Sequence, residues 1–226
     1  MTDLLSLRRR FGRLLDVYRT VRMAGEIARR APRRQGRPVV FFNASTRLSG
    51  LSLNAAFSLV TSWAVRLAGA PVVHFVCRAG MSRCVLGTDR DDFSQPPPCE
   101  MCLRQSRFNY AHAGAHWFTF RHDGRLAESL TGLRLDELMK YQSSVISHQS
   151  LVTDHCSLFT DPLPLGALVL PSIRWRLRLH NLVDDEPTRF LYREYILSAW
   201  NAASKFNALL ERNNPQTVVE IGRAHV

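Results

Sequence analysis

PVVFFNASTRLSGLSLNAAFSLVTSWAVRLAGAPVVHFVC, residues 38–77, is the stretch that decides the fold. Its two ends, 38–43 and 71–77, are short apolar runs rich in β-branched and aromatic residues, which is typical of buried strands. The segment between them carries apolar side chains three and four positions apart, which predicts a helix that Ser49 or Ser52 can cap and that Gly69 ends. The residues that mark one face of this helix are Leu53, Ala56, Phe57, Val60, Trp63, Ala64 and Leu67. A strand, a helix and a second strand form a βαβ unit, so we predict an α/β fold with a Rossmann-like parallel sheet flanked by helices.

The far end of the chain predicts a second unit of the same kind. Acidic residues at 184–186 precede Pro187, which suits the first turn of a helix. Apolar residues then form a regular seam as far as Leu210, Asn-Asn-Pro at 213–215 stops the helix, and Thr-Val-Val at 217–219 begins a strand. Residues 135–157 and 168–179 are also expected to be helical. We therefore expect one Rossmann-like domain over residues 38–219.

Positive charge is concentrated in the first 37 residues. They hold eleven arginines against three acidic residues, a net charge of +8 out of +11 for the whole chain. Apolar residues recur between the arginines, so we expect residues 1–37 to form a basic amphipathic helical arm. Such an arm can lie on an anionic membrane surface, where each basic residue contributes about 1 kcal/mol, or it can be a surface helix with solvated arginines. Nucleic-acid binding is disfavoured because the rest of the chain is nearly neutral.

The sequence shows no pattern of membrane insertion or export. No apolar run is as long as a membrane span, and the first residues lack the features of a signal peptide. We therefore expect a cytoplasmic protein whose residues 1–37 can touch the inner face of the membrane.

The last seven residues, Glu220–Val226, do not resemble the end of a folded domain. They read EIGRAHV, the translation of GAG ATC GGA AGA GCA CAC GTC, which contains a common sequencing-adapter stretch. We expect residues 220–226 to be an artefact tail and the chain to be the front part of a longer protein. A chance match is the alternative.

Four of the five cysteines fall in one window with the spacing C-x6-C-x14-C-x2-C: Cys77, Cys84, Cys99 and Cys102. Tetrahedral Zn²⁺ takes four thiolates, so we predict a structural zinc site. The prolines at 96–98 are expected to set up a knuckle-like turn at Cys99, and the zinc would pin a Cys-rich insertion over residues 77–102. Unligated thiols are the main alternative. An iron–sulfur cluster would also accept four thiolates, and a cytoplasmic setting disfavours disulfides.

The loop after the first strand is a candidate ligand site. It joins the carboxyl end of a strand to a helix N-terminus, where parallel sheets place ligands and backbone N–H groups attract anions. Its candidate binding residues are Ser49, Gly50 and Asn54, and a plain connection is the alternative. The loop lacks the glycine patterns of dinucleotide and P-loop nucleotide sites. Elsewhere, His112 and His116 are four residues apart and could share a helix face.

Several of these segments resemble the N-terminal domain of bacterial glycosyltransferases with the two-Rossmann (GT-B) architecture, including capsule and surface-polysaccharide enzymes. The resemblance spans roughly residues 38–219. It rests on VVFFN at 39–43 with the following loop, CRAGMSRCVLG at 77–87, PPCEMC at 97–102 and the run from 184 to 215.

The resemblance implies that the chain forms the acceptor side of an enzyme that transfers sugar from a nucleotide-sugar donor to a polysaccharide or lipid-linked acceptor. A second domain would bind the donor, so the fragment alone is expected to be inactive. Asp154 and His155 are the candidates for the base that deprotonates the acceptor hydroxyl, while Ser49, Gly50 and Asn54 would line the cleft.

A binding protein is the alternative class. In that interpretation a zinc-stabilised module uses its Arg-rich arm on nucleic acid or on an anionic membrane, and nucleic-acid affinity would fall steeply with salt. Another α/β transferase, such as a sulfotransferase, is disfavoured because the phosphate loop is missing.

Overall fold

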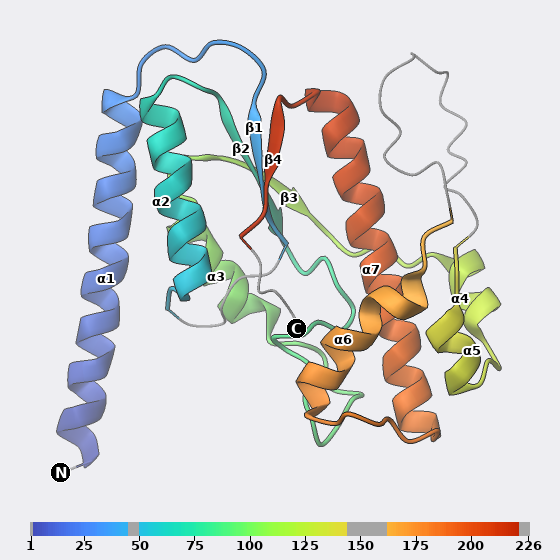
Figure 1. Cartoon of the computed structure of the whole chain (residues 1–226). Coiled ribbons are helices and arrows are strands. Elements are labelled where there is room, and N and C mark those ends of the chain that lie inside the picture. The colour runs from blue at the N-terminus through green and yellow to red at the C-terminus, as the bar shows by residue number, and fades with distance from the viewer. Residues whose placement is uncertain (1, 45–49, 144–161, 222–226) are drawn as a thin grey trace.

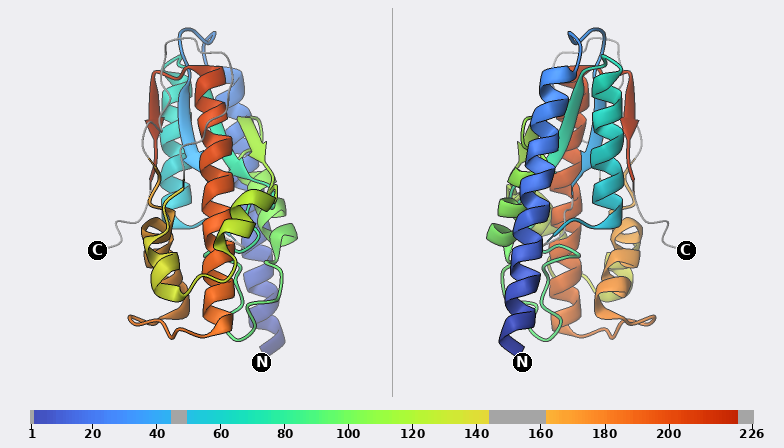
Figure 2. Two further views of the ribbon diagram at one scale, coloured as in Figure 1. Left: turned by 90° about the vertical axis from the view of Figure 1, so that its right-hand side faces the viewer. Right: turned by 90° about the vertical axis from the view of Figure 1, so that its left-hand side faces the viewer.

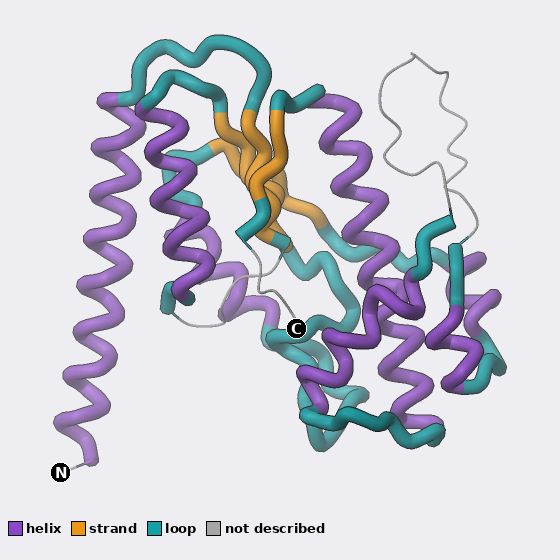
Figure 3. Tube along the Cα trace, viewed as in Figure 1, coloured by secondary structure: helices purple, strands orange, loops and turns teal. Residues whose placement is uncertain are grey.

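The computed structural model describes residues 2–44, 50–143 and 162–221. Within these ranges it has one parallel sheet with the strand order β3-β2-β1-β4 (Figures 1 and 3). The strands are β1 (Val39–Asn43), β2 (Val72–Cys77), β3 (Gly114–Phe118) and β4 (Thr217–Val219). Helices lie on both faces of the sheet, as the two side views of Figure 2 show. The predicted α/β class, with a parallel sheet flanked by helices, is confirmed.

One face of the sheet packs against the long helix α7 (Glu186–Asn213). The alternation of side chains along the strands sends Val40 and Phe75 to this face, where they meet Ala202 and Leu209 of α7. Phe118 of β3 stacks on Phe75 with ring centroids 4.3 Å apart. These fully or nearly fully buried side chains anchor α7 along the sheet.

The opposite face is covered by α2 (Leu53–Leu67), with α1 (Thr2–Arg30) and α3 (Cys99–Asn109) beside it. Leu59 and Trp63 of α2 pack with Val76 of β2 in a second buried cluster. Ala24 of α1 and Tyr110, just after α3, complete this cluster. The body therefore has three layers, with the sheet in the middle.

A separate helical cluster surrounds the N-terminal half of α7. It contains α4 (Gly124–Leu130), α5 (Leu135–Lys140) and α6 (Leu165–Leu177), and its centre is made of Leu138, Ile173, Leu191 and Ile196. With 28 residues α7 is about 42 Å long, whereas a five-residue strand spans about 17 Å. The helix therefore extends beyond the sheet, and the cluster packs on the part that projects (Figure 1).

Most boundaries expected from the sequence are confirmed. The Ser52 hydroxyl accepts a hydrogen bond from the Ala55 N–H at 3.2 Å, and Gly69 follows α2 with a φ of +92°. At the start of α7 the Asp185 carboxylate accepts from the Thr188 N–H at 2.9 Å. One expectation is wrong, because the helix that begins at Leu135 ends at Lys140 and not near 157; residues 144–157 lie outside the described ranges.

The face that α2 buries also differs from the expected one. Its buried residues are Ser58, Leu59, Ser62, Trp63 and Arg66, whereas Leu53 and Phe57 are 72% and 57% exposed. Both serine hydroxyls find acceptors, Asn43 Oδ1 for Ser58 and the Leu59 carbonyl for Ser62. Because these small side chains are satisfied, the helix can sit close to the sheet on its serine side. An apolar stripe is left facing outward: Leu53, Phe57, Val60 and Leu67.

None of the described helices is both long enough and apolar enough to cross a membrane.

Candidate functional site

The carboxyl edge of the sheet is where ligands bind in folds of this kind. From β1 the chain moves to β2 and then to β3 on one side, while β4 lies on the other side of β1. The point at which the strand order reverses is therefore between β1 and β4. Asn43 ends β1 at this point, and Cys77 ends the neighbouring strand β2.

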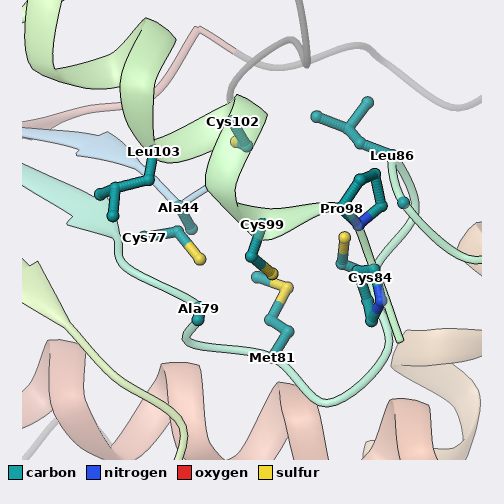
Figure 4. Close-up of a pocket in the computed structure, with 12 residues that line it drawn as sticks. Ala44, Cys77, Ala79, Met81, Cys84, Leu86, Pro98, Cys99, Cys102 and Leu103 are labelled. Atoms are coloured by element: carbon teal, nitrogen blue, oxygen red, sulfur yellow. The ribbon is translucent and has the colours of Figure 1, made fainter.

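A small cavity beside this edge brings the four predicted cysteines together. Cys77, Cys84, Cys99 and Cys102 all line it, with Ala44, which follows β1, and Met81 (Figure 4). Its volume is about 30 Å³. A water molecule needs about 10 to 15 Å³ on the same measure, so the space suits one or two small species.

Two of the thiols receive backbone hydrogen bonds from turns of the same sequence form, Cys-x-x-Gly. The Gly80 N–H donates to Cys77 Sγ at 3.1 Å, and the Leu86 and Gly87 N–H groups donate to the Cys84 sulfur. Ala79 adopts a left-handed conformation with a φ of +52°, and it immediately precedes the donor Gly80. Each turn therefore directs N–H dipoles at a sulfur atom.

The glycines of these turns have no room for a side chain. A Cβ atom at Gly80 would overlap the ring of Phe118, and one at Gly87 would lie 2.7 Å from the Cβ atom of Pro97. Pro97 and Pro98 lead into Cys99, so the close contact at Gly87 holds the second turn against the start of α3. The two turns are fixed to the body by packing on their glycine faces.

Cys99 and Cys102 belong to the first turn of α3, with Pro98 as its N-cap residue. Residues three apart share one face of a helix, so both thiols are directed to the same side. The expected knuckle-like turn at Cys99 is therefore wrong, because the residues from Cys99 onward form a regular helix. The N–H to sulfur geometry of a knuckle occurs instead at Cys77 and Cys84.

Burial raises the pKa of the Cys77 thiol to about 12, and the Gly80 N–H only partly opposes this. Burial also raises the pKa of Cys84 and Cys99. These three thiols are neutral at neutral pH, and no disulfide forms among the four cysteines. In the described ranges, His, Cys, Asp and Glu side chains form no group of three or more already arranged to hold a metal ion. The four thiols thus line one cavity, but their sulfur atoms are farther apart than the ligands of a single metal ion.

Of the other predicted site residues, the structure describes Gly50 and Asn54. The Gly50 N–H donates to Gln105 Oε1 of α3 at 3.1 Å, and Gly50 has a φ of +71°. Asn54 is half-buried in the first turn of α2, so both lie at the carboxyl edge. Ser49, Asp154 and His155 lie outside the described residues. 

The expected pairing of His112 with His116 is wrong. His112 lies in the turn after α3 with a φ of +58°, whereas His116 lies in β3. The intervening Gly114 begins the strand, so the two residues cannot share a helix face.

A buried polar group under α2 is absent from the sequence predictions. Asn43 Nδ2 lies 3.1 Å from His74 Nδ1, and the Ser58 hydroxyl donates to Asn43 Oδ1 at 2.9 Å. Burial, with the nearby charge of Arg66 as a smaller cause, lowers the pKa of His74 to about 3. Polar residues within two otherwise apolar strands were the signal that could have identified this group.

Comparisons of the chain with protein-family models, with curated proteins and with solved structures gave no match.

Proposed function

We propose that this chain forms the acceptor side of a glycosyltransferase, which transfers sugar from a nucleotide-sugar donor to a polysaccharide or lipid-linked acceptor. The observation that supports this most is the position of Gly50 and Asn54 between the carboxyl end of β1 and the first turn of α2, where parallel sheets place ligands. The resemblance over residues 38–219 points in the same direction. In this proposal the sheet is the N-terminal half of a GT-B architecture, and residues 77–102 are its Cys-rich insertion.

The proposed roles follow from acceptor chemistry. Ser49, Gly50 and Asn54 would hold the acceptor sugar through hydroxyl and backbone groups. Asp154 or His155 would take the proton of the attacking acceptor hydroxyl. The acceptor oxygen then bonds to the anomeric carbon of the donor, and the nucleotide diphosphate leaves. A partner domain would bind the donor, so this chain alone would bind acceptor without turning it over.

Acceptor binding can be measured directly by following backbone amide signals in NMR spectra. Oligosaccharides of the capsule type should shift the signals of Gly50 and residues 52–56 in a saturable manner. A nucleotide sugar added alone should leave these signals unchanged, since the donor would bind elsewhere.

A matched pair of substitutions tests the site. Asn54→Ala should weaken acceptor binding about tenfold, the loss of roughly one to two hydrogen bonds. Asn207→Ala, on the C-terminal half of α7, should not weaken it. Saturable oligosaccharide binding that maps away from residues 50–56, or none with any acceptor class, would refute the proposal.

The side chains of α1 favour a second activity, docking on an anionic membrane. Leu7, Phe11, Leu14 and Tyr18 recur every three or four residues along one side of α1, and all are about 60% or more exposed. The helix is held to the body near its C-terminal end, where Ala24 is fully buried. Exposed arginines at 13, 19 and 22 accompany the apolar stripe. Exposed apolar residues beside cations are what an interfacial helix requires, whereas nucleic acid would need the cations alone.

Vesicle co-sedimentation separates these partners. The protein should bind vesicles that contain phosphatidylglycerol and bind pure phosphatidylcholine weakly. Replacing both Phe11 and Leu14 by Ser should reduce binding at least tenfold, since each change removes an apolar side chain that would be buried in the membrane when the helix is bound. The control pair Leu168→Ser and Val183→Ser changes exposed apolar residues elsewhere and should have no effect. Binding to DNA or RNA that exceeds binding to vesicles would contradict membrane docking.

A further inference from the structure

We propose that Cys77, Cys84, Cys99 and Cys102 bind one Zn²⁺ ion as thiolates, and that the ion joins the end of β2 to the first turn of α3. This inference does not depend on the proposed sugar transfer. It assigns the cavity beside the carboxyl edge to a structural metal.

Four thiols from separate parts of the chain converge on this cavity. Cys77 ends a strand, Cys84 lies in the irregular segment between β2 and α3, and the other two thiols lie on α3. All four line one cavity of about 30 Å³ (Figure 4). A volume of this size suits a single ion rather than an iron–sulfur cluster with several metal and sulfide atoms.

Backbone N–H donors favour the thiolate form of these cysteines. Hydrogen bonds from Gly80 to Cys77, and from Leu86 and Gly87 to Cys84, stabilise a sulfur that carries negative charge. Cys99 and Cys102 lie at a helix N-terminus, where the helix dipole also favours thiolate. Neutral thiols in an apolar cavity have little need of such donors, whereas metal-bound thiolates do.

Metal binding also requires the four sulfur atoms to move closer together. Zinc–sulfur bonds are about 2.3 Å long, so the sulfurs must approach one another more closely than they do here. The two turns are held by the packing of Gly80 and Gly87, so the sulfurs would approach mainly by rotation about the Cα–Cβ bonds of the cysteines. Each thiol gives up its proton, so one Zn²⁺ replaces four protons and leaves a site of charge −2. The backbone donors offset part of that charge.

Four protein thiolates leave no open position on the ion. The site would therefore be structural and would not activate water. Its effect is to hold the crossover between β2 and β3 against the edge of the sheet.

The experiment is a cobalt titration of reduced, metal-free full-length protein, followed by zinc displacement. One equivalent of Co²⁺ should give the visible bands of tetrahedral cobalt together with thiolate charge-transfer absorption, and one equivalent of Zn²⁺ should remove both. A lack of these bands in folded protein would overturn the proposal, as would a coloured cluster in protein purified without oxygen.

Alkylation and substitution locate the ligands. In zinc-loaded protein, mass spectrometry should find these four cysteines protected from iodoacetamide relative to the metal-free protein, whereas zinc should not change the labelling of Cys156. Cys84→Ser and Cys102→Ser should each lower cobalt affinity at least tenfold, whereas Cys156→Ser, the fifth cysteine, should leave it unchanged. Labelling of the four thiols at equal rates with and without zinc would overturn the proposal even if a substituted variant failed to fold.

Discussion

His74 is a titratable residue with no access to water, in the middle of β2. Its side chain is fully buried, lies 4.8 Å from the Tyr110 ring between centroids, and has no hydrogen-bond partner at Nε2. Asn43 lies at its other ring nitrogen, where the amide N–H can donate to neutral imidazole. Protonation of His74 would place a positive charge in a buried site near the charge of Arg66. It would also remove the ring nitrogen that can accept the hydrogen bond from Asn43.

This environment predicts a pH dependence of stability. The folded-state pKa of His74 is about 3, below the 6.5 of an exposed histidine, so the unfolded chain binds the extra proton between these values. The free energy of unfolding should then fall as pH drops below about 6.5, by at most about 1.4 kcal/mol per pH unit for this group, and level off near pH 3. Urea denaturation between pH 7.5 and 5 measures the slope.

The control uses substitution of two histidines. His74→Gln removes the titration and should flatten the slope, whereas His180→Gln, at an exposed position, should leave it unchanged. Equal slopes for the native protein and the His74 variant would contradict the assignment.

Sequence reasoning located single residues well where their chemistry was distinctive. The spacing of the cysteines identified the four that share the cavity, and Ser52 is one of the two residues predicted as a cap. It could not find the backbone N–H groups aimed at Cys77 and Cys84, because these depend on turn conformations rather than on residue type. Nor could it reveal that Asn43 and His74 meet, since that contact depends on strand register.

At the scale of elements, α2 shows what hydrophobic periodicity leaves undecided. Apolar residues follow two sides of this helix, and only contact with the sheet selects the side with Leu59 and Trp63. Elements with weak apolar patterns were missed. The strand Gly114–Phe118 is half-exposed over most of its length, so it has no run of buried apolar residues. The start of α3 contains Cys99 and Cys102, which were interpreted as part of a metal-binding turn and not as a helix. The long apolar seam of α7, by contrast, was predicted almost to its ends.

The orientation of α2 predicts unequal costs for two neighbouring substitutions. Leu59→Ala removes a buried side chain and should lower the free energy of unfolding by about 2 to 5 kcal/mol. Phe57→Ser removes a larger side chain that is 57% exposed and should cost less than about 1 kcal/mol. Urea titrations of both variants measure the difference. A larger loss of stability for Phe57→Ser would mean that α2 packs on the sheet through the face with Phe57 and not through the face with Leu59.

At the scale of the molecule, two cores share one helix. The first half of α7 belongs to the cluster with α4, α5 and α6, and its second half belongs to the core of the sheet. The buried apolar residues of α7 belong to both cores. If one core unfolded, the part of this continuous 28-residue helix that it covers would lose its packing, and the helix would transmit the loss to the other core. The two cores should therefore unfold together.

Cooperative unfolding can be tested with one substitution in each core. Val40→Ala on the sheet and Ile173→Val in the helical cluster should each shift a single urea transition to lower concentration, the second by about 0.5 to 1.5 kcal/mol. Far-ultraviolet and near-ultraviolet circular dichroism should give coincident curves for both variants. Two separated transitions in either variant would show that the cores are independent.

The direction of α1 has a consequence for access to the carboxyl edge. In both views of Figure 2 the helix runs lengthwise beside the layers of the body, and it is not set across the end of the sheet. If a flat surface were to hold the exposed stripe of α1, the strands would run alongside that surface and would not point into it. The edge with Gly50 and Cys77 would then open sideways, parallel to the plane. A ligand that diffuses laterally in the membrane could then reach this edge without leaving the membrane plane. A ligand that approaches from the side of α1 would first meet that helix.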